Sequence, residues 1–459
     1  MTMNMTTAPR RLRWVDEAGL AACKAGLSPA ARDWVEAHGF LAERGRVLAL
    51  PDAAGGAPVE VWVGLGSGRV DLTLALGMPD RLPAGDYTLD ETLPEATTTT
   101  LALGFALGAY RFARYKAVAH AGARLVGPTG AGGDVVAAIA RADALARDLI
   151  NTPAQDMGPS ELSAAVAAVA QRHAAQFEAI VGDDLLSAGY PAVHAVGRSG
   201  AQAPRLLTLQ AGSTGPLVAL VGKGVCFDTG GLDLKPASGM ALMKKDMGGA
   251  AIALAVAELV LALELPVRLL LVIPAVENGV GPHAYRPGDV LKTRAGLTVE
   301  VTNTDAEGRI VLADALTRAS EAHPDVIIDF ATLTGAARVA LGPELPAAYG
   351  SDDALLAELT EAATAAADPV WPMPLWRGYE DELQSRIADL QNASSSGFAG
   401  SITAGLFLRR FVPSGQHWIH LDLYAWNPKD RPGRPVGAEA HTLRAVVEWL
   451  QRRYRTALT

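Results

Sequence analysis

A short polar segment carries two carboxylates and a guanidinium at regular spacing. Asp305, Glu307 and Arg309 alternate along the sequence NTDAEGR. In an extended chain, side chains two residues apart leave on the same side, so these three would line one wall. Gly308 would let the backbone approach a neighbour closely, and a helix is predicted at residues 310–320. Strand-to-helix junctions often carry the chemistry of open α/β sheets, although a solvated loop with a surface ion pair explains the same residues.

A second polar segment, residues 223–246, adds two more carboxylates. Asp228 follows a predicted buried strand, and Asp246 lies at the predicted start of a helix. All four carboxylates are expected near strand ends or helix starts, so they could converge. Anions crowded together repel strongly where the dielectric constant is low. A cation is therefore required to compensate them.

Two kinds of cation could balance these charges. Lys223, Lys235 and Arg309 could form an ion-pair network with a purely structural role. Alternatively, two divalent metal ions could bind the carboxylates, with Lys223 as a neutral amine ligand, because a buried lysine readily loses its proton. Lys235 and Arg309 would then stay charged and face a substrate. Oxygen-rich ligands suit Mg²⁺ or Mn²⁺, and Zn²⁺ also accepts carboxylates. The residue types leave both interpretations open.

Spacing excludes several other common sites. The sequence GKG at residues 222–224 lacks the GxxxxGK[ST] pattern of a phosphate-binding loop, and the glycines at residues 64–68 lack GxGxxG spacing. No HExxH motif occurs. The two cysteines, Cys23 and Cys226, are too few for a disulfide framework or a CxxC zinc site.

The composition indicates a globular chain with negative net charge. Its 459 residues are 49% hydrophobic, the formal net charge is -9 and the pI is about 5.5. The negative charge makes nucleic-acid binding an unexpected function. The N-terminus lacks the apolar segment of a secretory signal, and the apolar run at residues 251–265 is too short and too charged to span a bilayer. We therefore expect a soluble cytoplasmic protein without a membrane partner.

Strands and helices are predicted to alternate through the second part of the chain. Strands are expected at residues 205–210, 217–221, 267–276, 297–302, 326–330 and 418–424, and the main helices at residues 160–174, 249–263, 310–320, 354–366, 402–411 and 438–453. This rhythm predicts an α/β fold in which helices cover both faces of a mixed, mostly parallel sheet.

A Gly- and Pro-rich stretch at residues 127–133 is the best candidate for a linker. Before it, residues 59–64 and 72–74 are predicted as strands and residues 101–117 as a helix. We expect a smaller N-terminal α/β domain over residues 1–130 and a C-terminal domain, which would carry the chemistry, over residues 131–459.

The C-terminal part contains four polar, glycine-rich motifs: GKGVCFDTGG at residues 222–231, LDLKP at 232–236, MKKDMGG at 243–249 and NTDAEGR at 303–309. They resemble the motifs of the leucyl (cytosol) aminopeptidases, a family of dinuclear metallopeptidases. Supporting matches are RDLINTP at residues 147–153, ATLTG at 331–335 and AGSITA at 399–404. The motifs follow the family's order, and NTDAEGR is highly specific. Residues 1–130 resemble the family only loosely.

The resemblance implies two neighbouring metal sites. One site would use the side chains of Asp228, Asp305 and Glu307 with the backbone carbonyl of Asp305. The other would use Lys223, Asp228, Asp246 and Glu307. The ions would be zinc or manganese, with magnesium or cobalt able to exchange at one site. A water molecule shared by the ions would attack the peptide bond.

The resemblance also implies two catalytic side chains. Lys235 would help the metals to polarise the scissile carbonyl. Arg309 would hold a bicarbonate ion that acts as general base, and the planar fork of a guanidinium suits such an anion.

The side chain of the first substrate residue is implied to lie among Met243, Thr332, Leu333 and Gly335. Met243 is apolar and adaptable, so leucine and methionine should be favoured and charged side chains disfavoured. The other partners implied are peptides with a free N-terminus and further copies of the chain in a homohexamer. The alternative function is a non-catalytic DNA-binding or architectural role, which the acidic charge argues against.

Overall fold

The computed structural model describes most of the chain. The described residues are 8–52, 58–90, 93–117, 122–127 and 132–455. Among them, every helix is too short or too polar to cross a lipid bilayer.

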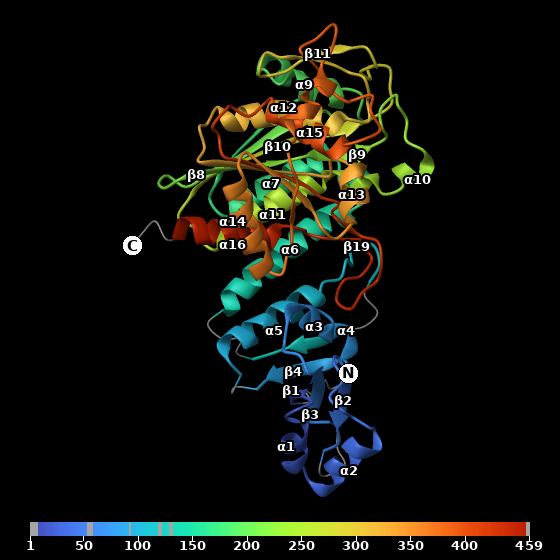
Figure 1. The fold of residues 1–459 in the computed structure, drawn as a ribbon, viewed down its shortest axis with the longest axis vertical. Coiled ribbons are helices and arrows are strands. Elements are labelled where there is room, and N and C mark those ends of the chain that lie inside the picture. The colour runs from blue at the N-terminus through green and yellow to red at the C-terminus, as the bar shows by residue number, and fades with distance from the viewer. Residues whose placement is uncertain (1–7, 53–57, 91–92, 118–121, 128–131, 456–459) are drawn as a thin grey trace, which may run out of the picture. The chain divides into compact units, whose positions relative to one another are not determined.

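The chain divides into two compact units, and each has its own sheet and hydrophobic core (Figure 1). The smaller unit comprises Met1–Ala144 with Lys429–Val436. The larger unit comprises Leu145–Pro428 with Gly437–Thr459, and it contains all the motifs described above.

The smaller unit has a five-stranded sheet with the order β2 (Val47–Leu50), β3 (Glu60–Gly66), β1 (Arg10–Asp16), β4 (Gly85–Leu89) and β5 (Ala123–Leu125). β2 runs antiparallel to β3, and the other three pairings are parallel. The helices are α1 (Leu20–Ala25), α2 (Pro29–Ala37), α3 (Leu72–Leu76), α4 (Met78–Arg81) and α5 (Glu95–Gly108).

Two predictions for the smaller unit were wrong. Residues 72–74 belong to α3 and not to a strand, because the Asp71 carboxylate accepts a hydrogen bond from the Leu74 backbone N–H and caps a helix. The helix predicted at residues 101–117 begins earlier and is α5, which includes the threonine run.

The larger unit is organised around a nine-stranded sheet. The order along its main path is β15 (Trp371–Pro372), β14 (Ala347–Gly350), β17 (Trp418–Asp422), β13 (Val326–Ala331), β8 (Leu217–Gly222), β10 (Arg268–Asn278), β7 (Arg205–Ala211) and β6 (Gln176–Val181). β9 (Gly224–Asp228) also pairs with β10. The central strands β17, β13, β8 and β10 are parallel, whereas β14, β7 and β6 pair antiparallel. The predicted mixed, mostly parallel sheet is confirmed.

Helices cover both faces of this sheet (Figure 1). One face carries α9 (Pro191–Gly197), α12 (Glu307–Ser320) and α15 (Gly400–Arg409); the other carries α7 (Pro159–Arg172), α11 (Gly248–Ala262), α14 (Asp353–Ala365) and α16 (Leu443–Arg455). The first thirteen residues of α11 are all buried, as expected for a helix that is apolar on every side.

The remaining elements are short, apart from α6. The helices are α6 (Gly133–Asn151), α8 (Asp184–Ser187), α10 (Ala237–Met240) and α13 (Gly335–Leu341), with 3₁₀ turns η1 (Ala154–Asp156), η2 (Met243–Met247) and η3 (Arg377–Leu383). Two small sheets pair β11 (Val290–Lys292), β12 (Thr298–Glu300) and β16 (Leu390–Gln391), and β18 (Trp426–Asn427) with β19 (Gly437–Ala438).

The carboxyl ends of the parallel strands bring polar residues to one edge of the sheet. Lys223 follows β8, Asp228 ends β9, Thr332 follows β13 and Asp422 ends β17. This edge is where open α/β sheets bind their ligands.

The expectation of an extended segment through Asp305, Glu307 and Arg309 was wrong. Helix α12 begins at Glu307, so Glu307 and Arg309 lie in its first turn. The Asn303 side chain accepts a hydrogen bond of 2.8 Å from the Asp305 backbone N–H, which turns the chain just before the helix. The carboxylate of Glu307 consequently lies at the positive end of the helix dipole.

Helix α11 packs so closely on β13 that it requires glycine. A Cβ atom on Gly249 would lie 2.1 Å from the Phe330 carbonyl oxygen. We predict that Gly249→Ala lowers the free energy of unfolding by about 1–3 kcal/mol, because the helix must move away from the strand. Denaturant unfolding measures this change. Gly239→Ala is the matched control, since its Cβ atom would meet its nearest neighbour at 3.6 Å. Equal losses in both variants would contradict the packing argument.

Candidate active site

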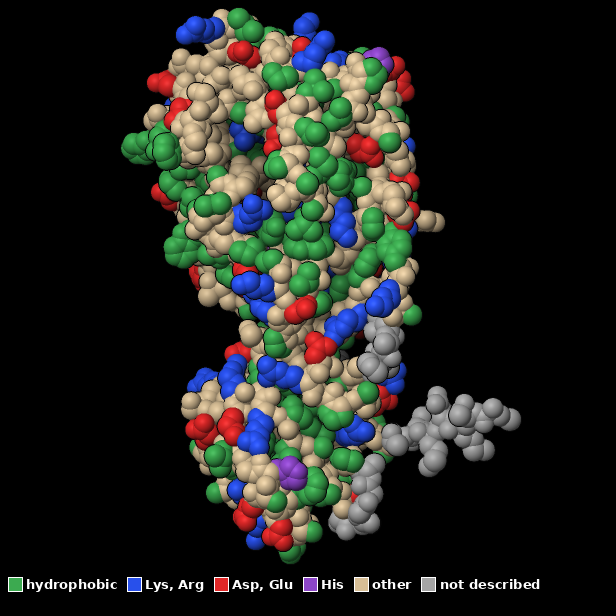
Figure 2. All heavy atoms as spheres, turned by 90° about the vertical axis from the view of Figure 1, so that its right-hand side faces the viewer, with side chains coloured by type: hydrophobic (Ala, Val, Ile, Leu, Met, Phe, Trp, Pro, Cys, Tyr) green, Lys and Arg blue, Asp and Glu red, His purple; other side chains and the backbone are tan. Residues whose placement is uncertain are grey.

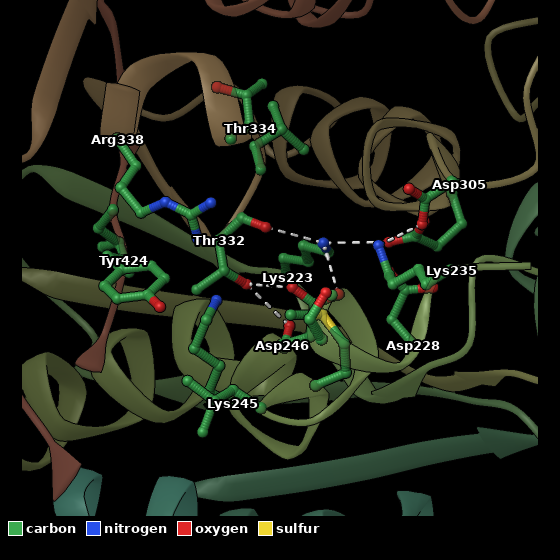
Figure 3. A pocket seen from close by; sticks show the side chains of 18 of the residues that line it. Lys223, Asp228, Lys235, Lys245, Asp246, Asp305, Thr332, Thr334, Arg338 and Tyr424 are labelled. Carbon is green, nitrogen blue, oxygen red and sulfur yellow. Dashed lines mark hydrogen bonds and ion pairs between the residues drawn. The ribbon is translucent and has the colours of Figure 1, made fainter. Parts of the chain in front are cut away.

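The predicted site residues gather around one cavity of about 360 Å³ at the edge of the sheet (Figure 3). Its lining includes every residue predicted for metal binding, catalysis or substrate binding except Arg309: Lys223, Asp228, Lys235, Met243, Asp246, Asp305, Glu307, Thr332, Leu333 and Gly335. Segments far apart in the sequence therefore meet at one place, and the carboxylates of the two polar segments lie in the same cavity.

Three of the carboxylates are close enough to share a cation. Asp228, Asp305 and Glu307 each offer an oxygen within 4.8 Å of the others. Burial, followed by repulsion from Asp228, raises the pKa of Glu307 to about 8 and that of Asp305 to about 6. The fold thus holds anions together at a cost that a cation would relieve.

Lys223 links the fourth carboxylate to this group. Its Nζ lies 2.7 Å from Asp246 Oδ2 and 3.0 Å from Glu307 Oε1, and it donates a hydrogen bond to the Thr332 carbonyl at 2.9 Å. Burial alone would lower the pKa of Lys223, but the surrounding carboxylates raise it above its ordinary value. Lys235 Nζ lies 2.8 Å from Asp228 Oδ2 and also pairs with Asp305. In this structure the two lysines, without Arg309, form the ion-pair network that the sequence left as one alternative.

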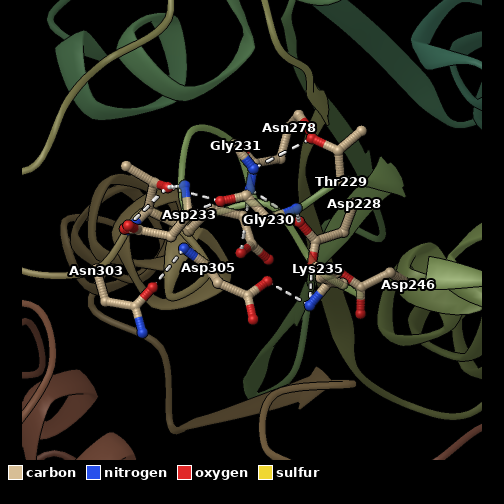
Figure 4. Close-up of polar contacts among 12 residues, drawn as sticks. Asp228, Thr229, Gly230, Gly231, Asp233, Lys235, Asp246, Asn278, Asn303 and Asp305 are labelled. Atoms are coloured by element: carbon tan, nitrogen blue, oxygen red, sulfur yellow. Dashed lines mark hydrogen bonds and ion pairs between the residues drawn. The ribbon is translucent and has the colours of Figure 1, made fainter. Parts of the chain in front are cut away.

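Glycines permit this close arrangement, and two of them, Gly230 and Gly231, lie near Asp228 and Lys235 in Figure 4. A Cβ atom on Gly308 would lie 2.4 Å from Lys223 Cε, so the lysine can cross the start of α12 only because residue 308 is glycine. Gly230 and Gly231 adopt positive φ values of 87° and 66°, which favour glycine. The resulting turn returns Lys235 to the carboxylate of Asp228, which also accepts a hydrogen bond from the Gly230 N–H.

Asn278, at the end of β10, is a site residue that was not predicted from the sequence. Its Nδ2 donates to Asp228 Oδ1 at 2.8 Å and to the Thr304 carbonyl at 3.0 Å, so it ties β9 to the segment before α12. Tyr285 donates to the same Thr304 carbonyl at 2.6 Å. The only signal in the sequence was a polar residue after a long apolar strand.

Asp422, at the end of β17, fixes the loop that follows β13. Its carboxylate accepts hydrogen bonds from the backbone N–H groups of Leu333 and Thr334, both at 3.1 Å, and from Thr334 Oγ1 at 2.6 Å. Thr332 Oγ1 in turn donates to Asp246 Oδ1 at 2.8 Å. Hydrogen bonds to Asp246 and to Asp422 therefore hold the loop that carries Thr332 and Leu333 in place.

Arg309 is buried and does not line the cavity. Its Nη1 donates to the Asn392 carbonyl at 2.7 Å, whereas its Nε has no hydrogen-bond partner among the described residues. Burial lowers the pKa of Arg309 to about 10. The guanidinium is charged at neutral pH and has an unused donor.

One side of the cavity carries a basic group that was not predicted from the sequence. Lys245 and Arg338 lie on either side of Tyr424, and all three line the cavity (Figure 3). Burial lowers the pKa of Lys245 to about 8. These residues carried no signal beyond their proximity to Met243 and Gly335 in the sequence.

The donor set fits divalent metal ions. Buried carboxylate oxygens converge, their mutual repulsion calls for positive charge, and Asn278 Oδ1 is buried beside them with no hydrogen-bond partner among the described residues. Oxygen-rich sites suit magnesium or manganese, and zinc also accepts carboxylates.

Comparison with known proteins gives concordant matches over both units. Residues 144–447 match the model of the cytosol aminopeptidase family, catalytic domain, and residues 10–128 match that of the M17 aminopeptidase, N-terminal domain. A probable cytosol aminopeptidase of Leifsonia xyli is 39% identical over 448 residues, which cover 92% of this chain and 90% of that protein. One from Geobacter sp. is 40% identical over 387 residues, which cover 81% of this chain and 78% of that protein.

Solved structures agree with these matches. The cytosol aminopeptidase from Coxiella burnetii is 45% identical, with a TM-score of 0.93 and 98% of both chains covered. The bottromycin maturation enzyme BotP in complex with Mn is 33% identical, with a TM-score of 0.87, 98% of this chain covered and 100% of that chain. These relatives lend no support to the alternative DNA-binding role. The chain belongs to the cytosol aminopeptidase family, a family of metal-dependent peptidases.

Proposed function

We propose that the chain removes the N-terminal residue from peptides with two divalent metal ions in this cavity. The observation that carries the proposal is the convergence of Asp228, Asp305 and Glu307 within 4.8 Å, with Asp246 joined to them through Lys223. One ion would be held by Asp228, Asp305 with its carbonyl, and Glu307. The other would be held by Lys223, Asp228, Asp246 and Glu307.

Zinc or manganese is the proposed native metal, with magnesium or cobalt able to exchange at one site. When bound, the two ions would lower the pKa of a water molecule and polarise the scissile carbonyl. Lys223 would have to lose its proton to serve as a ligand. The metal ions would favour this loss, because they would balance the carboxylates in place of the Lys223 ammonium group.

Lys235 and Arg309 are the proposed catalytic pair. Lys235 reaches into the cavity from the turn after β9, where its ammonium group could donate to the carbonyl oxygen as negative charge develops there. The unused Nε of Arg309 could donate to a bicarbonate ion, which would supply a general base.

The same cavity would select the end of the peptide. The free α-amine of a substrate, which peptide bonds further along the chain lack, could ligate one of the two metal ions in its neutral form. The first side chain would pack against Met243, Thr332, Leu333 and Gly335, so leucine and methionine are the proposed preferred residues.

Assembly, location and domain roles follow the family's pattern in this proposal. The chain would be a cytoplasmic homohexamer with an N-terminal domain over residues 1–130 and a catalytic domain over residues 131–459. Hydrophobic side chains gather in several places on the face of the larger unit shown in Figure 2. Among that unit's exposed residues are Trp371, Trp376 and Phe398, and exposed apolar surface of this kind supports association with other copies.

Metal removal should abolish activity. We expect a chelator to reduce hydrolysis of leucine p-nitroanilide to background, and Mn²⁺ or Zn²⁺ to restore it, because the ions would activate the water. Initial rates before chelation, after chelation and after metal addition measure this. Full activity in protein shown to be metal-free would disprove the proposed mechanism.

Replacement of the shared ligand should separate activity from folding. Glu307→Gln keeps the shape of the side chain but removes its charge, so we predict a loss of at least about a hundredfold in kcat. Circular dichroism and bound-metal analysis accompany the rate measurement. Glu264→Gln, at an exposed position, is the matched control and should keep the parent rate. Equal rates for both variants would show that Glu307 is not a metal ligand.

The metal-free protein should lose stability as the pH rises. The pKa of Glu307 is raised from its ordinary 4.5 to about 8, so the folded state binds this proton more tightly than the unfolded state. The contribution of Glu307 to the free energy of unfolding is fully present below about pH 4.5 and is lost as the pH rises through about 8. We predict a smaller decline in melting temperature for Glu307→Gln over this range. Added Mn²⁺ should stabilise the parent protein more at high than at low pH; the reverse order would contradict the site.

A further inference from the structure

Three side chains form a basic wall in the cavity that metal binding does not use. Lys245 Nζ lies 4.6 Å from the centre of the Tyr424 ring, and Arg338 Cζ lies 4.9 Å from the same centre. Figure 3 shows these three side chains on one side of the pocket and Asp305, Lys235 and Asp228 on the other. The cavity is therefore acidic at one end and basic at the other.

The two cations of this wall lack the carboxylate partners that the other two lysines lining the cavity, Lys223 and Lys235, have. Lys223 and Lys235 each pair with two carboxylates. Among the described residues, neither Lys245 nor Arg338 forms a direct ion pair with a carboxylate; Asp246 and Asp422 act on Lys245 only at longer range, and both cations contact the ring of Tyr424. Lys245 is 5% exposed, and a buried ammonium normally has an anionic partner. An anionic group bound between the two cations would provide the direct ion pair that neither cation forms within the described part of the chain.

The wall belongs to the segments that would surround the first side chain of the substrate. Lys245 follows Met243 by two residues in η2, and Arg338 follows Gly335 by one turn of α13. Tyr424 follows Asp422, the residue that holds the loop of Leu333. Met243, Leu333, Lys245 and Arg338 all line one cavity, so a long side chain bound between Met243 and Leu333 would have both cations in the same cavity.

We propose that, alongside leucine and methionine, the pocket accepts glutamate as the first residue, and that Lys245 and Arg338 bind its side-chain carboxylate. This inference rests on the proposed aminopeptidase function and deepens it. The methylene groups of glutamate would pack against Met243 and Leu333 in the way leucine does, while the carboxylate would reach the cations. The expectation that charged side chains are disfavoured then holds for lysine and arginine but not for glutamate.

The test compares substrates that differ only in the first residue. The full-length, manganese-loaded protein is assayed with the p-nitroanilides of Glu, Gln, Lys and Leu. The α-carboxyl group of each is an amide, so the side chain of Glu carries the only carboxylate among these substrates. We expect kcat/KM for Glu to exceed that for Gln by about tenfold or more, as for a charge-assisted contact, and Lys to be the poorest. Gln equal to Glu, or Lys better than Glu, would overturn the proposal.

Variants locate the effect. Arg338 is exposed, so Arg338→Met should fold, and we expect its Glu/Leu ratio of kcat/KM to fall about tenfold. Lys245→Met should lower the same ratio, and Arg338→Glu should make Lys a better substrate than Glu. Lys292→Met, which removes an exposed charge on β11, is the control and should keep the parent ratio. Unchanged ratios in both Met variants would overturn the assignment.

A binding measurement separates this proposal from the function on which it rests. Calorimetry with free L-glutamate and L-glutamine reports on the pocket without turnover. If no p-nitroanilide is cleaved, the proposed function fails, and preferential binding of glutamate would still support the basic wall. If leucine is cleaved but glutamate binds no better than glutamine, the function stands and the basic wall is refuted.

Discussion

The structure of the larger unit depends on holding negative charges together where water is largely excluded. Parallel strands end at one edge of the sheet, and the chain places Asp228, Asp246, Asp305 and Glu307 there. Two lysines offset part of this charge, and an excess of negative charge remains. The raised pKa values of Glu307 and Asp305 express the same constraint. A fold with no use for additional cations would gain stability by replacing these residues.

Much of the surrounding structure serves to keep the anions in place. Gly308 leaves room for Lys223, and Gly230 turns the chain so that Lys235 faces Asp228. Asn278 ties Asp228 to the segment before α12. Positioning of charged groups by hydrogen bonds from neutral donors is typical of sites whose geometry matters for chemistry.

The sequence predicted the sheet and the site residues to different degrees. Apolar runs such as that of β10 gave the strands, because a buried parallel strand is apolar on both faces. The motifs allowed ten of the cavity-lining residues to be predicted, because these residues are concentrated in a few short segments. The extended form of residues 305–309 was wrong, because the side chain of Asn303 decides the turn there. Asn278 could not be predicted, since its partners lie 26 and 50 residues away.

The basic wall shows why the side chains that line a substrate pocket are harder to predict from sequence than a set of metal ligands. Lys245 and Arg338 come from separate segments, and each alone is typical of a solvated surface. Their meaning depends on Tyr424, which brings the two cations to one ring inside the cavity. Only the packed structure reveals that they lack carboxylate partners among the described residues.

Anomalous scattering from crystals grown with zinc tests the central claim most directly. We predict two strong peaks in the cavity, both in contact with Asp228 and Glu307, with Lys235 no longer paired with Asp228. Crystals that show no peak there, with Lys223 and Lys235 still paired to the carboxylates, would mean that lysines alone balance the charge and that the site is structural.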